Sequence, residues 1–192
     1  MRLQPISIGP ITIETPVILA PMTGVTDLPF RRLVRSYGSG LNVTEMVASQ
    51  AAIRETRQSL RKTEWDLIEE PVSMQLVGCE PEAMGEAAKL SEDRGAAIID
   101  INMGCPAKKV TSGYAGSALM RAPDQAVRLI EAVCAAVASP VTLKMRLGWD
   151  RDMLTAPAIA QAAEVLGVGT TTVEDDWAVA RAWLGRELEG GG

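Results

Sequence analysis

A single cysteine stands where this sequence could carry out chemistry. Cys105 lies between Gly104 and Pro106 in the stretch DINMGCPAKKV, where Lys108 and Lys109 follow it closely. Because the stretch follows an apolar run, we expect the thiol to lie in a loop at the end of a buried strand. Nearby cations favour the thiolate. A thiol so placed can donate a proton to a carbanion, which requires only position and a suitable pKa.

The composition limits the kinds of chemistry that Cys105 can carry out. The 192 residues include no histidine, so a Cys–His nucleophilic pair is excluded. The other thiols, Cys79 and Cys134, are expected to be small core residues, as is usual for a lone cysteine. Without histidine or a CxxC pair, the sequence argues against a transition-metal site. We therefore predict that Cys105 is a catalytic proton donor and that no metal takes part.

Composition also bears on compartment and partner. Apolar residues make up 47% of the chain, yet no apolar run approaches the ~20 residues of a membrane span, and the N-terminus lacks the apolar core of a signal peptide. We expect a cytoplasmic protein with reduced thiols. The net charge is -5, but residues 105–148 hold six basic residues against two acidic ones, whereas residues 149–192 hold three against eight. The basic stretch is either a solvated face or a surface for phosphates.

The elements that must position these residues are short β-type runs alternating with helical patterns. Several runs are apolar on consecutive residues, as in strands that are covered on both faces. Strand and helix in alternation predict right-handed βαβ units and a parallel sheet. The runs cover residues 17–22, 41–47, 72–78, 97–104, 141–148 and, with a weaker pattern, 168–174.

Polar residues lie at the C-terminal ends of several predicted strands, namely Gln75, Asn102, Lys144 and Arg146. In a (βα)8 barrel the chemistry lies at this end of the strands. A doubly wound sheet is the alternative, but no GxGxxG stretch follows the first strand. A complete barrel needs eight strands and ~250 residues. The sequence therefore predicts the α/β class and an incomplete (βα)8 barrel of the TIM type, with about the first five to six βα units.

Two local features refine this prediction. Residues 26–38 are predicted as a helix that is capped by Thr26 or Asp27 and ends at Gly38. Its apolar face excludes three arginines: Phe30, Leu33, Val34 and Tyr37 lie on it, and Arg31, Arg32 and Arg35 lie off it. The step from the fourth strand to the fifth is longer than the others, which predicts an extra loop after Cys105.

Three motifs, in this order along the chain, carry a resemblance to a known family. They are APMTGVTDLPFR at 20–31, the stretch around Cys105 at 100–119, and PVTLKMRLGW at 140–149. They resemble the bacterial tRNA-dihydrouridine synthases, most specifically those of the B type, and the similarity runs to about residue 173. That family has an FMN-binding (βα)8 barrel, followed by a helical domain that helps to hold tRNA. The resemblance implies FMN-dependent reduction of uridine to 5,6-dihydrouridine in tRNA, with NADPH as the reductant.

The resemblance also implies roles at the flavin. Pro21, Met22 and Thr23 would line the flavin ring, and Gln75 would hydrogen-bond the pyrimidine edge of that ring. Lys144 would lie on the N1 and O2 side, where a fixed cation stabilises the anionic reduced flavin.

The remaining implied roles concern the substrate. Asn102 would contact substrate or flavin beside the cysteine. Cys105 would protonate C5 of uracil as hydride passes from flavin N5 to C6. Lys108, Lys109 and Arg146 would meet tRNA phosphates, in keeping with the local excess of basic residues.

The resemblance ends near residue 173. Glu174 stands where the family has the histidine of a His-Gly-Arg motif, and an anion there would repel the flavin phosphate. The chain is therefore divided into residues 1–173, the N-terminal part of a flavin-binding TIM barrel, and residues 174–192, a divergent acidic tail. The family's C-terminal helical tRNA-binding domain is expected to be absent. An abrupt change of this kind is expected from a frameshift, an early stop or a misjoined gene model.

Two alternatives fit the same residues. A flavin barrel that acts on free pyrimidines would use a similar site, although the basic loop after Cys105 favours tRNA. The other alternative is a non-catalytic protein, either a truncated remnant or a half-barrel assembly module. An open piece of a barrel exposes two sheet edges, through which such a module would self-associate.

Overall fold

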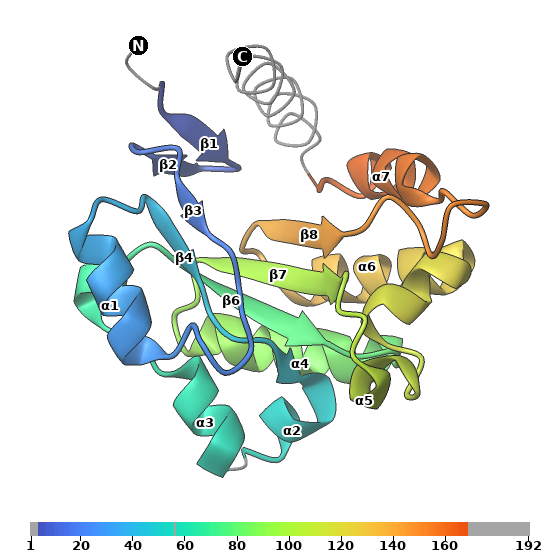
Figure 1. Cartoon of the computed structure of the whole chain (residues 1–192), viewed down its shortest axis with the longest axis horizontal. Coiled ribbons are helices and arrows are strands. Elements are labelled where there is room, and N and C mark those ends of the chain that lie inside the picture. The colour runs from blue at the N-terminus through green and yellow to red at the C-terminus, as the bar shows by residue number, and fades with distance from the viewer. Residues whose placement is uncertain (1–3, 56, 169–192) are drawn as a thin grey trace, which may run out of the picture.

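The computed structural model describes residues 4–55 and 57–168 as strands alternating with helices (Figure 1). The strands are β1 (Ile6–Ile8), β2 (Ile11–Ile13), β3 (Ile18–Leu19), β4 (Leu41–Val43), β5 (Val47–Ala48), β6 (Val72–Val77), β7 (Ile98–Met103) and β8 (Val141–Met145). The α-helices are α1 (Leu28–Ser36), α2 (Ser49–Ile53), α3 (Arg57–Thr63), α4 (Pro81–Asp93), α5 (Lys108–Thr111), α6 (Pro123–Ala136) and α7 (Ala156–Val165). The connections contain the 3-10 helices η1 (Leu67–Glu69) and η2 (Gly116–Arg121).

The main sheet is parallel and follows the order β3, β4, β6, β7, β8, while β5 pairs with the end of β6. Neighbours in the sheet are successive βα units of the chain, which is the order of a (βα)8 barrel, whereas a doubly wound sheet reverses its order midway. Figure 1 shows α4 and α6 behind β6, β7 and β8. The sheet is thus a curled part of a barrel, which confirms the predicted incomplete TIM-type fold.

Side chains of the central strands alternate between a helix-covered face and an inner face, because successive residues of a strand point to opposite sides. The helix-covered face is apolar and buried, and it includes Met74, Leu76, Ile99, Ile101 and Met103. The inner face carries polar side chains at paired positions of the register: Gln75 pairs with Asp100, Asp100 with Thr142, and Asn102 with Lys144. The main hydrophobic core therefore lies on the helix-covered side of the sheet, and the polar residues gather on the inner face toward the carboxyl ends of the strands.

An antiparallel hairpin, β1–β2, precedes the main sheet and is absent from the predicted elements. Its two-residue turn begins with Gly9, whose φ of +56° is readily adopted by glycine. Ile8 and Ile13 of the hairpin pack with Leu41 and Ile98, which lie near the N-terminal ends of β4 and β7. The hairpin therefore covers the apolar end of the inner face.

Five of the predicted strands are present, with shorter bounds. The run at 41–47 divides into β4 and β5, and the run at 17–22 contributes only Ile18–Leu19. The predicted helix at 26–38 corresponds to α1, the helical patterns expected between the later strands correspond to α4, α6 and α7, and the extra length after β7 contains α5 and η2. The sixth predicted strand, 168–174, and the tail at 174–192 lie outside the described residues, apart from Val168.

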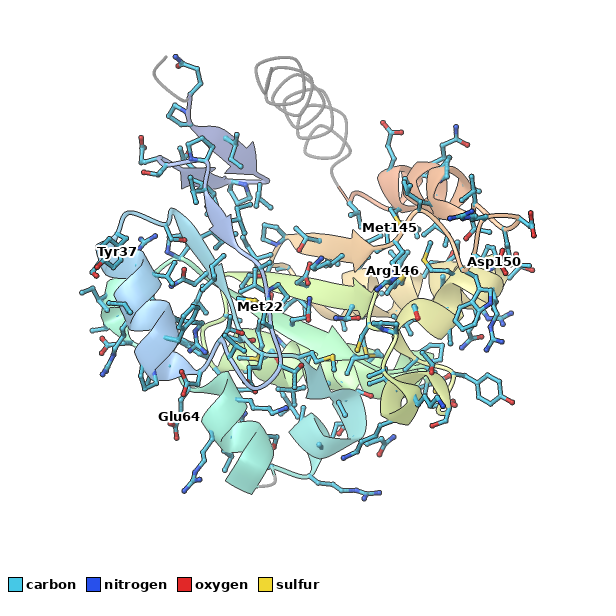
Figure 2. The ribbon with its side chains drawn as sticks, viewed as in Figure 1. Met22, Tyr37, Glu64, Met145, Arg146 and Asp150 are labelled. Atoms are coloured by element: carbon cyan, nitrogen blue, oxygen red, sulfur yellow. The ribbon has the colours of Figure 1, made fainter. Side chains whose placement is uncertain are left out.

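The predicted orientation of α1 is wrong. The helix begins as predicted, because the Asp27 carboxylate accepts a hydrogen bond from the Phe30 backbone N–H at 3.1 Å. However, the side chain on its buried face is Arg31, which is completely inaccessible to solvent. Leu33 is 53% and Tyr37 85% exposed, and Figure 2 shows Tyr37 at the outer side of α1. An apolar stripe marks the buried face of a helix only where no buried ion pair occupies that face instead.

Candidate active site

A cavity of about 380 Å³ lies at the carboxyl ends of the parallel strands. Seven of the ten predicted site residues line it: Pro21, Thr23, Gln75, Asn102, Cys105, Lys144 and Arg146. Met46, Gly104, Pro106 and Met145 complete the lining. Figure 2 shows Met145 and Arg146 at the end of β8. The thiol and the Lys144 ammonium, which are separated by 39 positions in the sequence, therefore face the same space.

The other three predicted site residues do not line this cavity. Met22 is 40% exposed, although its neighbours on both sides reach the cavity. Lys108 and Lys109 are exposed on α5, which directly follows the cysteine loop. Their position beside the cavity rather than in it suits a contact with a large ligand that covers the opening. Their roles stay predictions.

A chain of hydrogen bonds connects the strands beneath the cavity. The Gln75 Nε2 donates to Asp100 Oδ2 at 2.6 Å, and the Asn102 Nδ2 donates to Gln75 Oε1 at 2.9 Å. Asn102 Oδ1 in turn accepts from the backbone N–H of Gly104 at 3.1 Å and of Cys105 at 2.9 Å. Gln75 and Asn102, two of the predicted site residues, therefore hold the loop that carries Cys105.

Asp100 also takes part in this series of hydrogen bonds, although it was not predicted as a site residue. Burial raises the pKa of its carboxyl to about 6, although hydrogen bonds from Gln75 and Thr142 and the positive charge of Lys144 oppose the shift. Thr142 Oγ1 donates to Asp100 Oδ1 at 2.7 Å. The sequence held a signal for this site, because a carboxylate within the run Ile-Ile-Asp-Ile is costly unless it is partnered.

The cysteine loop is also fixed from two other directions. The Arg146 Nε donates to the Gly104 carbonyl at 2.7 Å, which joins the end of β8 to the loop. The Ser117 N–H donates to the Cys105 carbonyl at 3.0 Å. Gly116 makes this approach possible, because its φ is +60° and a Cβ there would lie 2.7 Å from the Cys105 carbonyl oxygen. Glycine is therefore required at this position by both conformation and space.

The loop after β3 forms the opposite wall of the cavity. Thr26 is fully buried, and its hydroxyl accepts from the Met22 N–H at 3.0 Å. The Gly24 N–H donates to Glu45 Oε1 at 2.6 Å, and Glu45 also lies 3.6 Å from the Lys62 Nζ. The backbone next to Pro21 and Thr23 is thus held by side chains on both sides.

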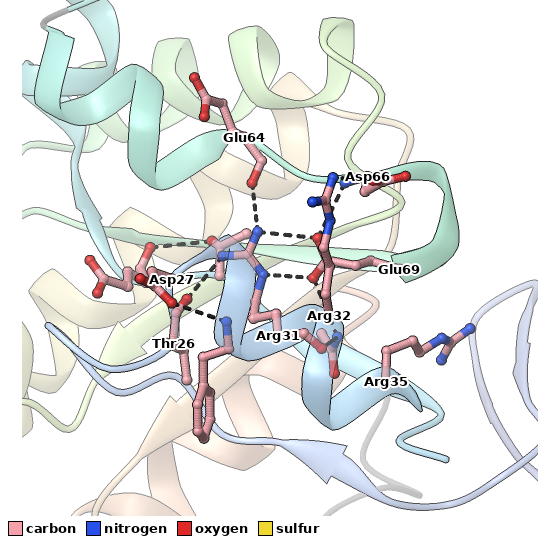
Figure 3. Close-up of polar contacts among 12 residues, drawn as sticks. Thr26, Asp27, Arg31, Arg32, Arg35, Glu64, Asp66 and Glu69 are labelled. Atoms are coloured by element: carbon pink, nitrogen blue, oxygen red, sulfur yellow. Dashed lines mark hydrogen bonds and ion pairs between the residues drawn. The ribbon is translucent and has the colours of Figure 1, made fainter. Parts of the chain in front are cut away.

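A buried ion pair supports the same loop (Figure 3). The Arg31 Nε donates to Glu69 Oε1 at 2.8 Å, and neither side chain is accessible to solvent. Arg31 also donates through Nη1 to the Thr26 carbonyl at 2.9 Å and through Nη2 to the Glu64 carbonyl at 2.5 Å. This guanidinium joins the loop after β3 to the segment before β6, and neither Arg31 nor Glu69 was predicted to matter to the site.

Neither a candidate metal centre nor a membrane-spanning helix occurs among the described residues. No group of three or more histidine, cysteine, aspartate or glutamate side chains within 4–55 and 57–168 is arranged to hold a metal ion. Across the same residues, no helix is both long enough and apolar enough to span a membrane.

The fold and the cavity define a barrel protein whose polar side chains gather at the carboxyl ends of parallel strands, the position of enzyme sites in this architecture. Residues 18–174 match the family model described as dihydrouridine synthase (Dus), and the chain belongs to this family.

Individual relatives agree with this assignment. The chain is 57% identical over 164 residues to a probable tRNA-dihydrouridine synthase of Rhodobacter capsulatus, covering 85% of this chain and 51% of that protein. It is 53% identical over 171 residues to a probable tRNA-dihydrouridine synthase of Rickettsia bellii, covering 88% and 52%. It is 50% identical over 166 residues to the tRNA-dihydrouridine synthase B of Xanthomonas campestris, covering 86% and 50%. The chain thus spans about half the length of the curated relatives it matches.

Proposed function

We propose that this chain carries the catalytic half of a flavin-dependent tRNA-dihydrouridine synthase. The observation that supports this most directly is the meeting of Cys105, Gln75 and Lys144 in one cavity. FMN, when bound, would supply the hydride for C6 of the uracil ring and would be reduced again by NADPH. The enzyme would act in the cytoplasm, on uridine in tRNA.

The residues present fit the pyrimidine edge of a flavin. That edge offers carbonyl oxygens and a nitrogen that becomes anionic on reduction, and it needs donors and a cation. Lys144 supplies an exposed ammonium on the inner face, and Gln75 supplies a carboxamide held by neighbours. Pro21 and Thr23 lie on the well-anchored loop opposite, where they would pack against the ring, and the predicted contact of Met22 would have to be made from the edge of the cavity.

The chain's own residues would then handle the proton and the substrate. Cys105 Sγ would donate its proton to C5 as hydride reaches C6, which saturates the C5=C6 bond, and the thiolate would regain a proton from water. Asn102 would orient the base or the ring beside the thiol. Lys108, Lys109 and Arg146 would bind tRNA phosphates around the opening.

The test is formation of dihydrouridine in unmodified tRNA, measured by mass spectrometry with FMN and NADPH present. We expect Cys105→Ala to lower the rate by about 10²- to 10⁴-fold, the usual share of a positioned acid. Cys134→Ala is the matched control, because this thiol lies at the apolar core and its pKa is raised by burial. Equal activity of both variants would rule out the proposed role. Free uracil or uridine as a second substrate distinguishes a tRNA enzyme from a reductase of free pyrimidines.

The division of the chain belongs to the same proposal. Residues 1–173 would form the N-terminal part of the flavin-binding barrel, and 174–192 a separate tail. The curated relatives are about twice as long as the matched region. The residues of these relatives beyond the matched region are numerous enough for the rest of a barrel and for a helical domain that orients tRNA.

A second function is favoured by a specific surface. Four apolar side chains are exposed on the edge strand β3, just before it, and on α1: Val17 (47%), Ile18 (38%), Leu33 (53%) and Tyr37 (85%). Exposed apolar side chains at a sheet edge and on a helix suit a half-barrel assembly module that pairs with a second copy. Sedimentation velocity of the full chain tests it. Dimers that dissociate in the double variant Leu33→Ser with Tyr37→Ser would support the module, whereas a monomer at high concentration would exclude it.

A further inference from the structure

Asp100 is a buried carboxylate on the inner face of β7 that no role described above requires. Its side chain lies between β6 and β8, with the residue only 6% exposed. Both of its oxygens accept short hydrogen bonds, from Gln75 at 2.6 Å and from Thr142 at 2.7 Å. Lys144 of β8 is the charged group that acts on it. Burying a charged carboxylate in this position is costly, so the presence of Asp100 here needs a physical reason.

The direction of the hydrogen bonds explains why a carboxylate is present at this position. An ionised carboxylate can only accept, so Gln75 must present its NH2 group to Asp100 and its oxygen to the other side. Asn102 must then present its own NH2 group to Gln75. Its remaining oxygen faces the N–H groups of Gly104 and Cys105, which can only donate. With a carboxylate at one end and backbone donors at the other, only one orientation of both amides satisfies every group.

We propose that Asp100 is a positioning residue: its carboxylate fixes the orientation of the Gln75 and Asn102 amides and thereby holds the loop that carries Cys105. The inference rests on the proposed function, because it assigns Gln75, Asn102 and Cys105 to one reaction. It adds a residue that touches neither the flavin nor the base. Thr142 binds the second oxygen and keeps the carboxylate pointing along the chain of amides.

Protonation of Asp100 would release one end of this arrangement. Because burial raises the pKa of its carboxyl to about 6, the proton is taken up only slightly below neutral pH. A protonated carboxyl can donate to the Gln75 oxygen as well as accept from the Gln75 NH2 group, so a second orientation becomes accessible in which the Gln75 NH2 group faces Asn102. Asn102 would then direct its own NH2 group at the N–H groups of the cysteine loop, where no hydrogen bond forms. Among the described residues, the groups that act on Asp100 are Gln75 from β6 and Thr142 and Lys144 from β8, and Lys144 is the charged one of these three.

The test is a pH titration of the full chain by ¹H–¹⁵N NMR, without flavin. We expect three signals to move with one common midpoint near the Asp100 pKa of about 6: the Gln75 side-chain amide, the Asn102 side-chain amide and the Cys105 backbone amide. Asp100→Asn should abolish this movement. Separate midpoints, or movement that persists in Asp100→Asn, would overturn the proposal.

Two further variants keep the test decisive if Asp100→Asn does not fold. Thr142→Val removes a donor to the carboxylate and should move the common midpoint to higher pH, whereas Thr142→Ser should leave it in place. An unchanged midpoint in Thr142→Val would count against the proposal. The side-chain amide of Gln125, which donates to the Cys79 carbonyl at 2.7 Å and lies outside this chain of amides, reports whether each variant is folded.

Flavin binding separates this inference from the proposed function. We expect FMN, followed by quenching of its fluorescence, to bind Asp100→Asn at least tenfold more weakly than wild type near neutral pH. The wild type should approach the variant's affinity well below pH 6. If no variant binds FMN while the three amides titrate together, the proposed function fails and the positioning by Asp100 stands. If FMN binds equally to wild type and Asp100→Asn, the positioning fails and the proposed function stands.

Discussion

Replacing Arg31 by methionine should destabilise the chain strongly and in a pH-dependent way. Methionine fills much of the same space but removes every donor of the guanidinium. The Glu69 carboxylate would then lose its ionic partner at a site with no access to solvent. The carbonyls of Thr26 and Glu64 would lose their donors as well. Removing one partner of a buried pair leaves an uncompensated charge, which typically costs about 3–5 kcal/mol.

The part of this cost that comes from the charge cannot exceed the free energy of protonating Glu69, because the unpaired carboxyl can take up a proton instead. An ordinary glutamate has a pKa of about 4.3, so holding it neutral at about pH 7 costs roughly 3.7 kcal/mol, and at about pH 5 roughly 1 kcal/mol. The variant would therefore take up a proton on folding. Its deficit relative to wild type should shrink by about 2–3 kcal/mol between these two pH values.

Urea unfolding of wild type and variant at both pH values measures this difference. Glu69→Gln in the Arg31→Met background should remove most of the pH dependence, because no charge is left to neutralise. Arg32→Met is the control on the same helix, since the Arg32–Asp66 pair is largely exposed and contributes little. A deficit that is the same at both pH values would refute the view that an uncompensated charge causes it.

Three further outcomes are expected. Gly116→Ala should destabilise the chain by about 2 kcal/mol or more, because a positive φ and a close carbonyl act together, whereas Gly38→Ala, with a positive φ and open space, should cost about 1 kcal/mol in thermal unfolding. Lys144→Met should raise the pKa of Asp100, seen in its ¹³C carboxyl titration, because the positive charge favours the ionised form. Glu45→Ala should leave the Gly24 N–H without its acceptor and increase its hydrogen exchange, while the Cys105 N–H, held by Asn102, exchanges as before.

The sequence carried enough information for the order of the strands and for the end at which polar residues gather. Strands covered by helices are apolar on one face, and the exceptions at their ends, such as Gln75 and Asn102, stand out against that background. Parallel strands bring those exceptions to one edge of the sheet, so residues far apart in sequence could be placed together. The fold class and the shared cavity follow from this reasoning.

Partners of buried charges could not be predicted in the same way. Arg31 lies on a helix whose apolar stripe suggested the opposite face, and Glu69 lies in a short 3-10 helix with no pattern of its own. Their pairing depends on a long-range approach that local periodicity does not encode. The hairpin β1–β2 has three residues in each strand, which is too short for a reliable alternation. Asp100 was not predicted as a site residue, although a charged side chain within an apolar run is costly unless it is partnered.

The inner face explains why the candidate site lies at one end of the strands. Near the N-terminal ends, Leu41 and Ile98 are apolar and are covered by the hairpin, so this part is dry and stabilises the sheet. Two residues further along β7 the inner face becomes polar with Asp100, and after two more it reaches Asn102. Gln75, Asp100 and Asn102 are each held there by a neighbour on an adjacent strand. Because the helix-covered face supplies most of the hydrophobic core, substitutions in this polar part of the inner face should alter cofactor binding more than stability.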